Sequence, residues 1–339
     1  MAVKIINSIG ELQKKNGLSN KIPLFAQQEY ADYLISFKGV KTIWFVEMEG
    51  DSLMFILPFT IHKKFSFTKG YFHTAVNNLE NSSVEREQLF LNAVISIIKK
   101  TKLCDWIQQP PNWAIFNSYP DGAVFAPFGS YKINLQEKTK DELFDSIQTK
   151  DRSDIRKAVK EGVEVKNGFH LLNDALVLIK QTAEKANISV PTVNELNYLK
   201  NNLNVFVSYH QSIPQSSAVF YSNNYAWYNM YAGAKDKPFR GSNSLLYWSA
   251  IKFAKESKVL FFDFVGARIN PEPGSKQEKI QRFKEHFGVE LHKGYIWKMP
   301  ISKVKYSLYS FLIKIISIIK RKKLKSDIID QEIERQINV

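Results

Sequence analysis

The sequence predicts an α/β protein made of two tandem domains with mixed central sheets, followed by a basic, amphipathic helical tail. Two observations predict this fold class. Helices, an antiparallel set of strands, and then a helix and a strand occur in that order twice along the chain. The length of 339 residues, with 44% hydrophobic and 13% aromatic residues, also suits two packed cores better than one. We expect domains at residues 1–149 and 150–298, and the tail at residues 299–339.

The first domain opens with a helical pattern at Leu24–Phe37. Two strands are then predicted, Thr42–Glu47 and Ser52–Pro58, and the dipeptide Gly50-Asp51 between them is typical of a hairpin turn. A second helix is predicted over Val84–Lys99, because its apolar residues recur at helical spacing. Further short strands, separated by prolines and glycines, complete the domain.

The second domain repeats this order of elements. Its predicted elements are helices at Leu171–Ala183 and Asn194–Lys200, strands at Val205–His210, Ser217–Tyr221 and Ala226–Tyr231, a helix at Asn243–Glu256 and a buried strand at Leu260–Phe264. The order is that of an acetyltransferase-type (GNAT) fold, so a duplicated GNAT-like fold is the economical interpretation. The repeat rests on the pattern of elements, because no identity between the two halves is visible in the sequence.

The charge pattern indicates an anionic partner. The formal net charge is +14, which suits RNA, a phosphorylated substrate or an anionic membrane. Part of this charge is local, since residues 303–325 hold eight Lys or Arg and no acidic residue around an apolar run at Tyr306–Ile319. This segment either lies on the inner surface of a membrane or packs on the protein itself. The residues from Asp327 onward predict an exposed amphipathic helix.

Several classes of protein lack support in the sequence. There is no G-x-G-x-x-G, P-loop or G-x-S-x-G motif, which disfavours nicotinamide, nucleotide-hydrolysing and serine-hydrolase chemistry. The six histidines do not fall at metal-ligand spacing, so we expect no metal site and no tightly bound cofactor. The lone Cys104 cannot form an internal disulfide, and neither a signal peptide nor a spanning apolar run is visible. We expect a cytoplasmic protein that is either free or peripheral on the inner face of the cytoplasmic membrane.

Four short segments carry a resemblance to a known family. They are the basic run Arg152–Ala158, the aromatic strand Trp227–Gly233, the strand Leu260–Gly266 with its acidic Asp263, and Ile280–Gly288. The basic run predicts a helix, for which we expect Ser153 as N-cap and Gly162 as the C-terminal glycine. Each motif is short, but their order and spacing resemble the Fem family of aminoacyltransferases, which add amino acids to peptidoglycan precursors. The resemblance runs from about residue 20 to residue 298.

The most informative of these segments is the helix around Lys284. Lys284 shares an apolar stripe with Phe283 and Phe287, so it is either a lysine that reaches out to solvent or a cation of a pocket. A Phe-Lys pair at this place handles the aminoacyl donor in the family. The resemblance therefore implies catalytic roles for Lys284, as a positive charge near the donor phosphate or the developing oxyanion, and for Phe283, lining the donor site.

The resemblance also implies a set of substrate-binding residues, namely Tyr228, Tyr231, Arg156, Asp263 and Arg240. Each of these residues also has a structural explanation that requires no substrate. Aromatic residues on a strand are usually core, and cations on a helix usually form a solvated face. An acidic residue in an apolar strand needs a partner, so Asp263 is either a structural anchor or a pocket residue.

Two features differ from the family pattern. Val190 and Asp32 stand where family members carry cations that grip the diphosphate of a nucleotide-linked acceptor, which favours a lipid-linked precursor or another amine. The loop Lys237–Asn243 has only one arginine and one glycine of the motif that receives coenzyme A pyrophosphate. This favours aminoacyl-tRNA over acyl-CoA as co-substrate.

Three functions follow as hypotheses. The first is transfer of an activated acyl or aminoacyl group to an amine of a cell-envelope precursor. The second is an N-acyltransferase that uses acyl-CoA or acyl-carrier protein and acts on an amino sugar or lipid in polysaccharide or lipid biosynthesis. The third is a membrane-peripheral protein that binds RNA or lipid without catalysis.

Overall fold

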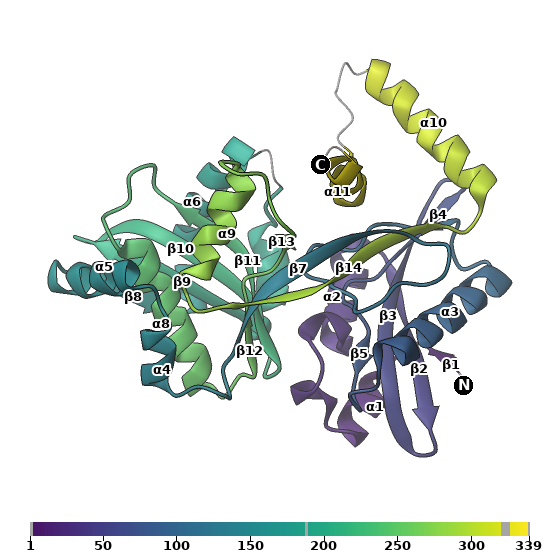
Figure 1. Cartoon of the computed structure of the whole chain (residues 1–339), viewed down its shortest axis with the longest axis horizontal. Coiled ribbons are helices and arrows are strands. Elements are labelled where there is room, and N and C mark those ends of the chain that lie inside the picture. Colours follow the sequence, from purple (N-terminus) through teal and green to yellow (C-terminus); the bar gives the residue numbers. More distant parts are fainter. Residues whose placement is uncertain (1–2, 187–188, 320–325, 338–339) are drawn as a thin grey trace.

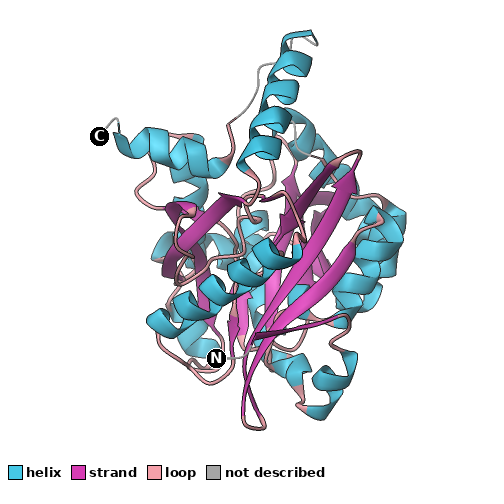
Figure 2. Cartoon of the chain, turned by 90° about the vertical axis from the view of Figure 1, so that its right-hand side faces the viewer, coloured by secondary structure: helices cyan, strands magenta, loops and turns pink. Residues whose placement is uncertain are grey.

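The computed structural model describes residues 3–186, 189–319 and 326–337 and shows a mixed α/β fold around one long sheet (Figure 1). The strand order along the sheet is β1-β2-β3-β4-β6-β14-β7-β12-β11-β10-β9-β8, with β5 and β13 paired at its sides. Helices lie on both sides of the strands, and one helix near the C-terminus projects beyond the body (Figure 2). The expected fold class, two tandem GNAT-like α/β halves, is confirmed.

The first half contains three α-helices and most of the strands at one end of the sheet. Its elements are β1 (Val3–Ile6), α1 (Gly10–Lys15), α2 (Gln28–Lys38), β2 (Lys41–Glu49), β3 (Ser52–Lys64), β4 (Phe67–Tyr71), β5 (Asn77–Asn78), α3 (Val84–Thr101), β6 (Trp106–Ile107) and β7 (Val124–Asn134). The expected hairpin is present between β2 and β3, where Gly50 takes a positive φ of 59°.

The second half follows the predicted order closely. Its elements are α4 (Lys140–Asp145), α5 (Thr149–Lys160), β8 (Val163–Asn167), α6 (Leu172–Ala186), α7 (Val193–Tyr198), β9 (Leu203–His210), β10 (Ile213–Ser222), β11 (Ala226–Ala234), α8 (Ser242–Glu256), β12 (Phe261–Asp263), β13 (Ala267–Arg268), α9 (Lys276–Glu285), β14 (Glu290–Pro300), α10 (Lys303–Ile319) and α11 (Ile328–Ile337).

The two halves are joined by strands that cross between them. β7 lies between β12 and β14, both of which come from later in the chain, and the far end of β14 pairs with β6 of the first half. Residues 131–147 accordingly pack in the core of the second half. The division at residues 149 and 150 stays a prediction, and we propose that a boundary drawn by packing lies near residue 124.

The two expected ends of the basic helix have different outcomes. Ser153 as N-cap is wrong, because α5 already begins at Thr149 after Gln148 and Ser153 lies inside the helix. The sequence before Arg152 is polar and charged, so apolar periodicity gave no sign of this first turn. The helix end at Gly162 is confirmed, with a φ of 80° just after Glu161.

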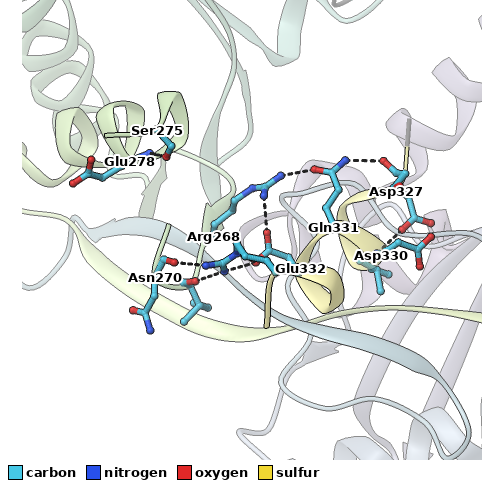
Figure 3. A network of polar contacts seen from close by, with 12 residues as sticks. Arg268, Asn270, Ser275, Glu278, Asp327, Asp330, Gln331 and Glu332 are labelled. Carbon is cyan, nitrogen blue, oxygen red and sulfur yellow. Dashed lines mark hydrogen bonds and ion pairs between the residues drawn. The ribbon is translucent and has the colours of Figure 1, made fainter. Parts of the chain in front are cut away.

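The end of the chain divides into two different helices. α10 leaves most of its apolar side chains exposed, whereas α11 lies against β7 and β14 with Ile329 fully buried. The carboxylate of Glu332 is also buried and pairs with Arg268 and Arg335 (Figure 3). The expectation of an exposed helix after Asp327 is therefore wrong, since its acidic residues pair with cations of the second half. The basic run Lys320–Lys323 lies outside the described residues.

No described helix is both long and apolar enough to cross a membrane. Cys104 is a buried free cysteine, at 3% exposure.

The glycine at the end of the aromatic strand is required by close packing. A Cβ atom at Gly233 would lie 2.4 Å from the backbone nitrogen of Ile179 and from the backbone of Leu178 in α6. We expect Gly233→Val to lower the free energy of unfolding by about 3 kcal/mol or more, because a helix backbone cannot yield to the added side chain. Urea unfolding measures this, with Ala232→Val at the neighbouring exposed position as matched control. Equal stability of the two variants would contradict the close approach.

Candidate active site

A cavity of about 440 Å³ opens between the two halves, and we call it the central cleft. Its walls come from the 74–81 and 113–117 segments of the first half and from β7, β11, β12 and β14. Among the described residues that line it there are two lysines and no carboxylate. The lining residues are Lys21, Pro23, Thr74, Ala75, Val76, Asn77, Asn78, Asn81, Trp113, Ile115, Asn117, Lys132, Tyr225, Tyr228, Phe261 and His292.

Asp263 is a buried carboxylate beside this cleft. Its exposure is 1%, and Oδ1 accepts hydrogen bonds from Ser130 Oγ at 2.5 Å and from the Val265 backbone N–H at 2.7 Å. Oδ2 lies 3.6 Å from Lys132 Nζ and has no hydrogen-bond donor within the described residues. One oxygen thus anchors the strand end, and the other forms an ion pair with Lys132.

Lys284 lies near Asp263 and is also buried, at 9% exposure. It belongs to α9, whose first turn is capped by Ser275 Oγ accepting from the Glu278 N–H at 3.1 Å. Its ammonium group donates to the backbone carbonyls of Val265 and Gly266, the latter at 2.8 Å. Burial lowers the pKa of Lys284 to about 8, although the charge of Asp263 opposes the decrease.

The turn held by Lys284 has an uncommon backbone. Val265 and Gly266 both take positive φ angles, 48° and 45°, and such a conformation is unfavourable for a β-branched residue. A Cβ atom at Gly266 would lie 2.7 Å from the Asn112 side chain, which precedes the cleft residue Trp113. Lys284 itself does not line the cleft. Its charge is fixed behind the wall, where it stabilises the carbonyls of this turn.

The other aromatic candidates are separated by the fold. Tyr228 is paired in register with Asp263 and lines the cleft. Tyr231 lies further along β11 and packs against Tyr221, with ring centroids 6.1 Å apart. Phe283 packs against Tyr247 and Phe287, at 5.4 and 5.2 Å between centroids, in the core of the second half. Only Tyr228 of these three borders the cleft.

The two arginine candidates lie away from the cleft, around α5. The Arg240 side chain donates to Asp154 Oδ1 at 2.8 Å, and the Arg156 guanidinium lies 5.2 Å from the centre of the Phe144 ring. Both contacts are made within the second half. The structure therefore brings together Lys284, Asp263 and Tyr228, and leaves Arg156, Arg240, Tyr231 and Phe283 elsewhere.

Side chains from α5 occupy the N-terminus of α8. Asp151 Oδ1 accepts from Ser244 Oγ at 2.6 Å, and its Oδ2 lies 2.8 Å from His286 Nδ1. A Cβ atom at Gly241 would lie 2.4 Å from the Asp154 carbonyl oxygen, so the two helices touch. The positive end of the α8 dipole thus already faces the Asp151 carboxylate and the backbone carbonyl of Asp154.

Of the cleft residues that were not predicted from the sequence, Lys132 and His292 lie near Asp263. Lys132 and His292 reach the cleft from β7 and β14, next to Ser130. Burial and the nearby Lys132 lower the pKa of His292. The signal for Lys132 was its position between the apolar Tyr131 and Ile133, which places it on the opposite face of the strand. His292 carried no such signal. The described residues contain no cluster of metal-ligating side chains.

The fold and the cleft define a class of protein with two GNAT-like halves that share one sheet and enclose a polar cleft between them. Among solved structures, FemX is similar over 91% of this chain and 99% of its own, with a TM-score of 0.68 and 14% identity. A conserved protein of unknown function from Bacteroides thetaiotaomicron covers 87% of this chain and 99% of its own, with a TM-score of 0.50 and 10% identity. A tandem GNAT protein from the clavulanic acid biosynthesis pathway covers 88% and 99%, with a TM-score of 0.49 and 9% identity.

No family model and no curated protein matches the sequence. At 14% identity the similarity to FemX establishes the fold alone, which is therefore Fem-like.

Proposed function

We propose that this chain is an acyl- or aminoacyl-transferase that moves an activated group onto an amine in the central cleft. The observation that carries the proposal is the buried ammonium of Lys284 near the Asp263 carboxylate, at a cleft lined by Lys132. Buried charges of this kind with a strongly shifted pKa are typical of functional sites. The Fem-like fold supports the same assignment.

The chemistry requires little of the protein beyond position and charge. The acceptor nitrogen attacks the carbonyl carbon of the donor, a C–N bond forms, and the bond from that carbon to the ester oxygen or thioester sulfur breaks. The amine loses one proton and the leaving oxygen or sulfur takes one. Negative charge develops on the carbonyl oxygen, and Lys132 in the cleft wall stabilises it directly. The buried charge of Lys284 behind the wall adds to the positive field and holds the Val265–Gly266 turn in place. Phe283 would support α9 from the core.

The contact between α5 and the N-terminus of α8 helps to decide which acyl donor the chain uses. Coenzyme A pyrophosphate binds in acetyltransferases at a helix N-terminus, and in this chain the N-terminus of α8 faces Asp151 and Asp154. A pyrophosphate placed there would meet the Asp151 carboxylate and the tight contact between α5 and α8. This supports aminoacyl-tRNA, or an acyl-carrier protein, over acyl-CoA bound at α8. Arg240 and Arg156 then contribute to the outer surface that receives the carrier.

The lining of the cleft bears on the acceptor. Four asparagines, Lys21 and Lys132 offer amides and cations and no carboxylate among the described lining residues. Such a surface suits sugar or peptide groups that carry a phosphate. We propose a lipid-linked envelope precursor as acceptor, because Val190 packs on the apolar core and Asp32 is acidic where a diphosphate would need cations. The amides also favour the second candidate, N-acylation of an amino sugar.

A donor screen tests the proposal. Purified protein is incubated with charged tRNAs, acyl-CoAs or acylated carrier protein, together with bacterial lipid extract, and products are identified by mass spectrometry. We expect a mass increment on an amine-bearing acceptor with charged tRNA, lost after RNase treatment. An increment with a thioester donor, together with release of free thiol, would replace the tRNA assignment with the N-acyltransferase. No product from any donor would contradict an enzymatic function.

A further inference from the structure

α10 carries apolar side chains on two opposite faces. Its inner face packs on the body, where the rings of Tyr306 and Tyr309 lie 6.0 and 4.5 Å from the Trp106 ring, centre to centre. Its outward face bears apolar residues at spacings of four, three, four and three, which we call the outer stripe. The outer stripe is Val304, Leu308, Phe311, Ile315 and Ile318, with exposures from 36% to 80%. A helix of a water-exposed surface ordinarily has polar residues there.

A second apolar group lies beside this helix. Phe65 sits at the turn between β3 and β4, is 86% exposed, and takes a positive φ of 56°. A hollow of about 270 Å³ is lined by residues of this turn together with Leu312 and Ile316 of α10. The turn and the C-terminal part of α10 therefore border one another.

The charge around these groups identifies the kind of partner. Lys63 and Lys64 precede Phe65, and residues 303–325 contain eight Lys or Arg and no acidic residue. A second copy of the chain on this surface would bring cations against cations. An anionic lipid surface instead offers both an apolar interior and negative headgroups.

We propose that the outer stripe of α10 and the side chain of Phe65 insert together into the interface of an anionic bilayer, with α10 lying along its plane. The 17 residues of α10 span roughly 25 Å, with lysines at both sides of the stripe, and no described helix suits a transmembrane course. Two separate segments of the chain thus form one docking surface. Insertion of this surface into a bilayer is independent of any transfer activity.

Vesicle flotation tests the surface with the full chain. Vesicles of equimolar phosphatidylglycerol and phosphatidylcholine are compared with vesicles of phosphatidylcholine alone. We expect wild type to float with the anionic vesicles only, and to be released by high salt. The triple variant Leu308→Ser, Phe311→Ser and Ile315→Ser should bind at least about tenfold more weakly, because apolar burial is lost. The matched control replaces three exposed apolar residues of other helices, Ile35, Val159 and Val177, by serine and should float like wild type.

A labelled variant locates the contact directly. Cys104 is buried, and burial raises the pKa of its thiol to about 12, so a cysteine introduced by Phe311→Cys is the one that reacts with an environment-sensitive fluorophore. We expect a blue shift of its emission with anionic vesicles. Flotation of the triple variant at wild-type level, or an unshifted emission, would overturn the proposal. So would a wild-type dimer that the triple variant converts to monomer without any flotation, which would make the surface an interface between copies.

Discussion

Replacing Lys284 by methionine is expected to lower the rate of transfer by at least about 100-fold, because the buried cation that holds the Val265–Gly266 turn behind the cleft wall is lost. Methionine retains an unbranched apolar stem in the buried position, so the helix face stays filled. The rate is measured with the donor identified in the screen. Lys279→Met on the exposed side of the same helix is the matched control and should keep wild-type activity.

The dependence on pH separates a role of charge from a role in folding. If the ammonium form of Lys284 is required, the rate falls as pH rises through about 8. Lys284→Arg keeps a charge at every accessible pH and should remove this fall. A rate that instead continues to rise above pH 8 would contradict the cationic role and favour the neutral amine as a base.

Stability carries an independent signature of the same residue. The pKa of Lys284 is lowered in the folded chain from its ordinary value of 10.5, so the unfolded chain binds more protons between about pH 8 and pH 10.5. Folding stability contributed by this residue therefore rises with pH across that window. Lys284→Met should show no such rise relative to wild type in urea unfolding.

Local patterns predicted the local elements well. The helices α3 and α8 have strong apolar periodicity and clear ends, and both were found within two residues of their true bounds. The hairpin at Gly50 follows from its turn residues in the same way. Lys284 was recognised because a cation on an apolar stripe breaks the pattern of the helix.

The centre of the molecule depends on contacts that no local pattern records. β14 pairs with β7 and with β6, two strands that lie far earlier in the chain, and in this register Ser130 lies opposite His292. 

The register of these central strands explains what the sequence did not reveal. Lys132, His292 and Asp263 come from three strands that are far apart in the chain, and they approach one another only because β7 pairs with β12 on one side and β14 on the other. Gly294 permits the close approach of β14 to the segment around Phe116, since a Cβ atom at Gly294 would lie 2.3 Å from the Phe116 carbonyl oxygen. Periodicity within a strand carries no information on such long-range pairing.

Long-range contacts also determine the position of α11, the last helix described. The alternation of acidic and isoleucine residues after Asp327 predicted an exposed amphipathic helix, and its amphipathic character is correct. Its position is not, because Arg268 and Lys298 of the second half pair with its carboxylates. A cation partner that lies some 30 to 60 residues away is not visible in the helix's own sequence.

Replacing Asp263 by asparagine is expected to shift the alkaline fall in the transfer rate to lower pH by about one unit, since an opposite charge nearby is lost. The negative charge of Asp263 raises the pKa of Lys284 against the effect of burial, so its removal lets that pKa fall below about 8. Asparagine keeps an oxygen that accepts from Ser130 and from the Val265 N–H, so the strand end remains anchored.

The control for this prediction is the same substitution in the Lys284→Arg background. Arginine does not titrate in the accessible range, so in the Lys284→Arg background Asp263→Asn should not shift a fall of the rate at alkaline pH, which we call the alkaline limb of the profile. The difference between the two backgrounds isolates the coupling of the two residues. Full pH–rate profiles of the four proteins measure it. If Asp263→Asn leaves the limb of the wild-type profile in place, Asp263 acts only as an anchor of β12, and the alkaline limb does not belong to Lys284.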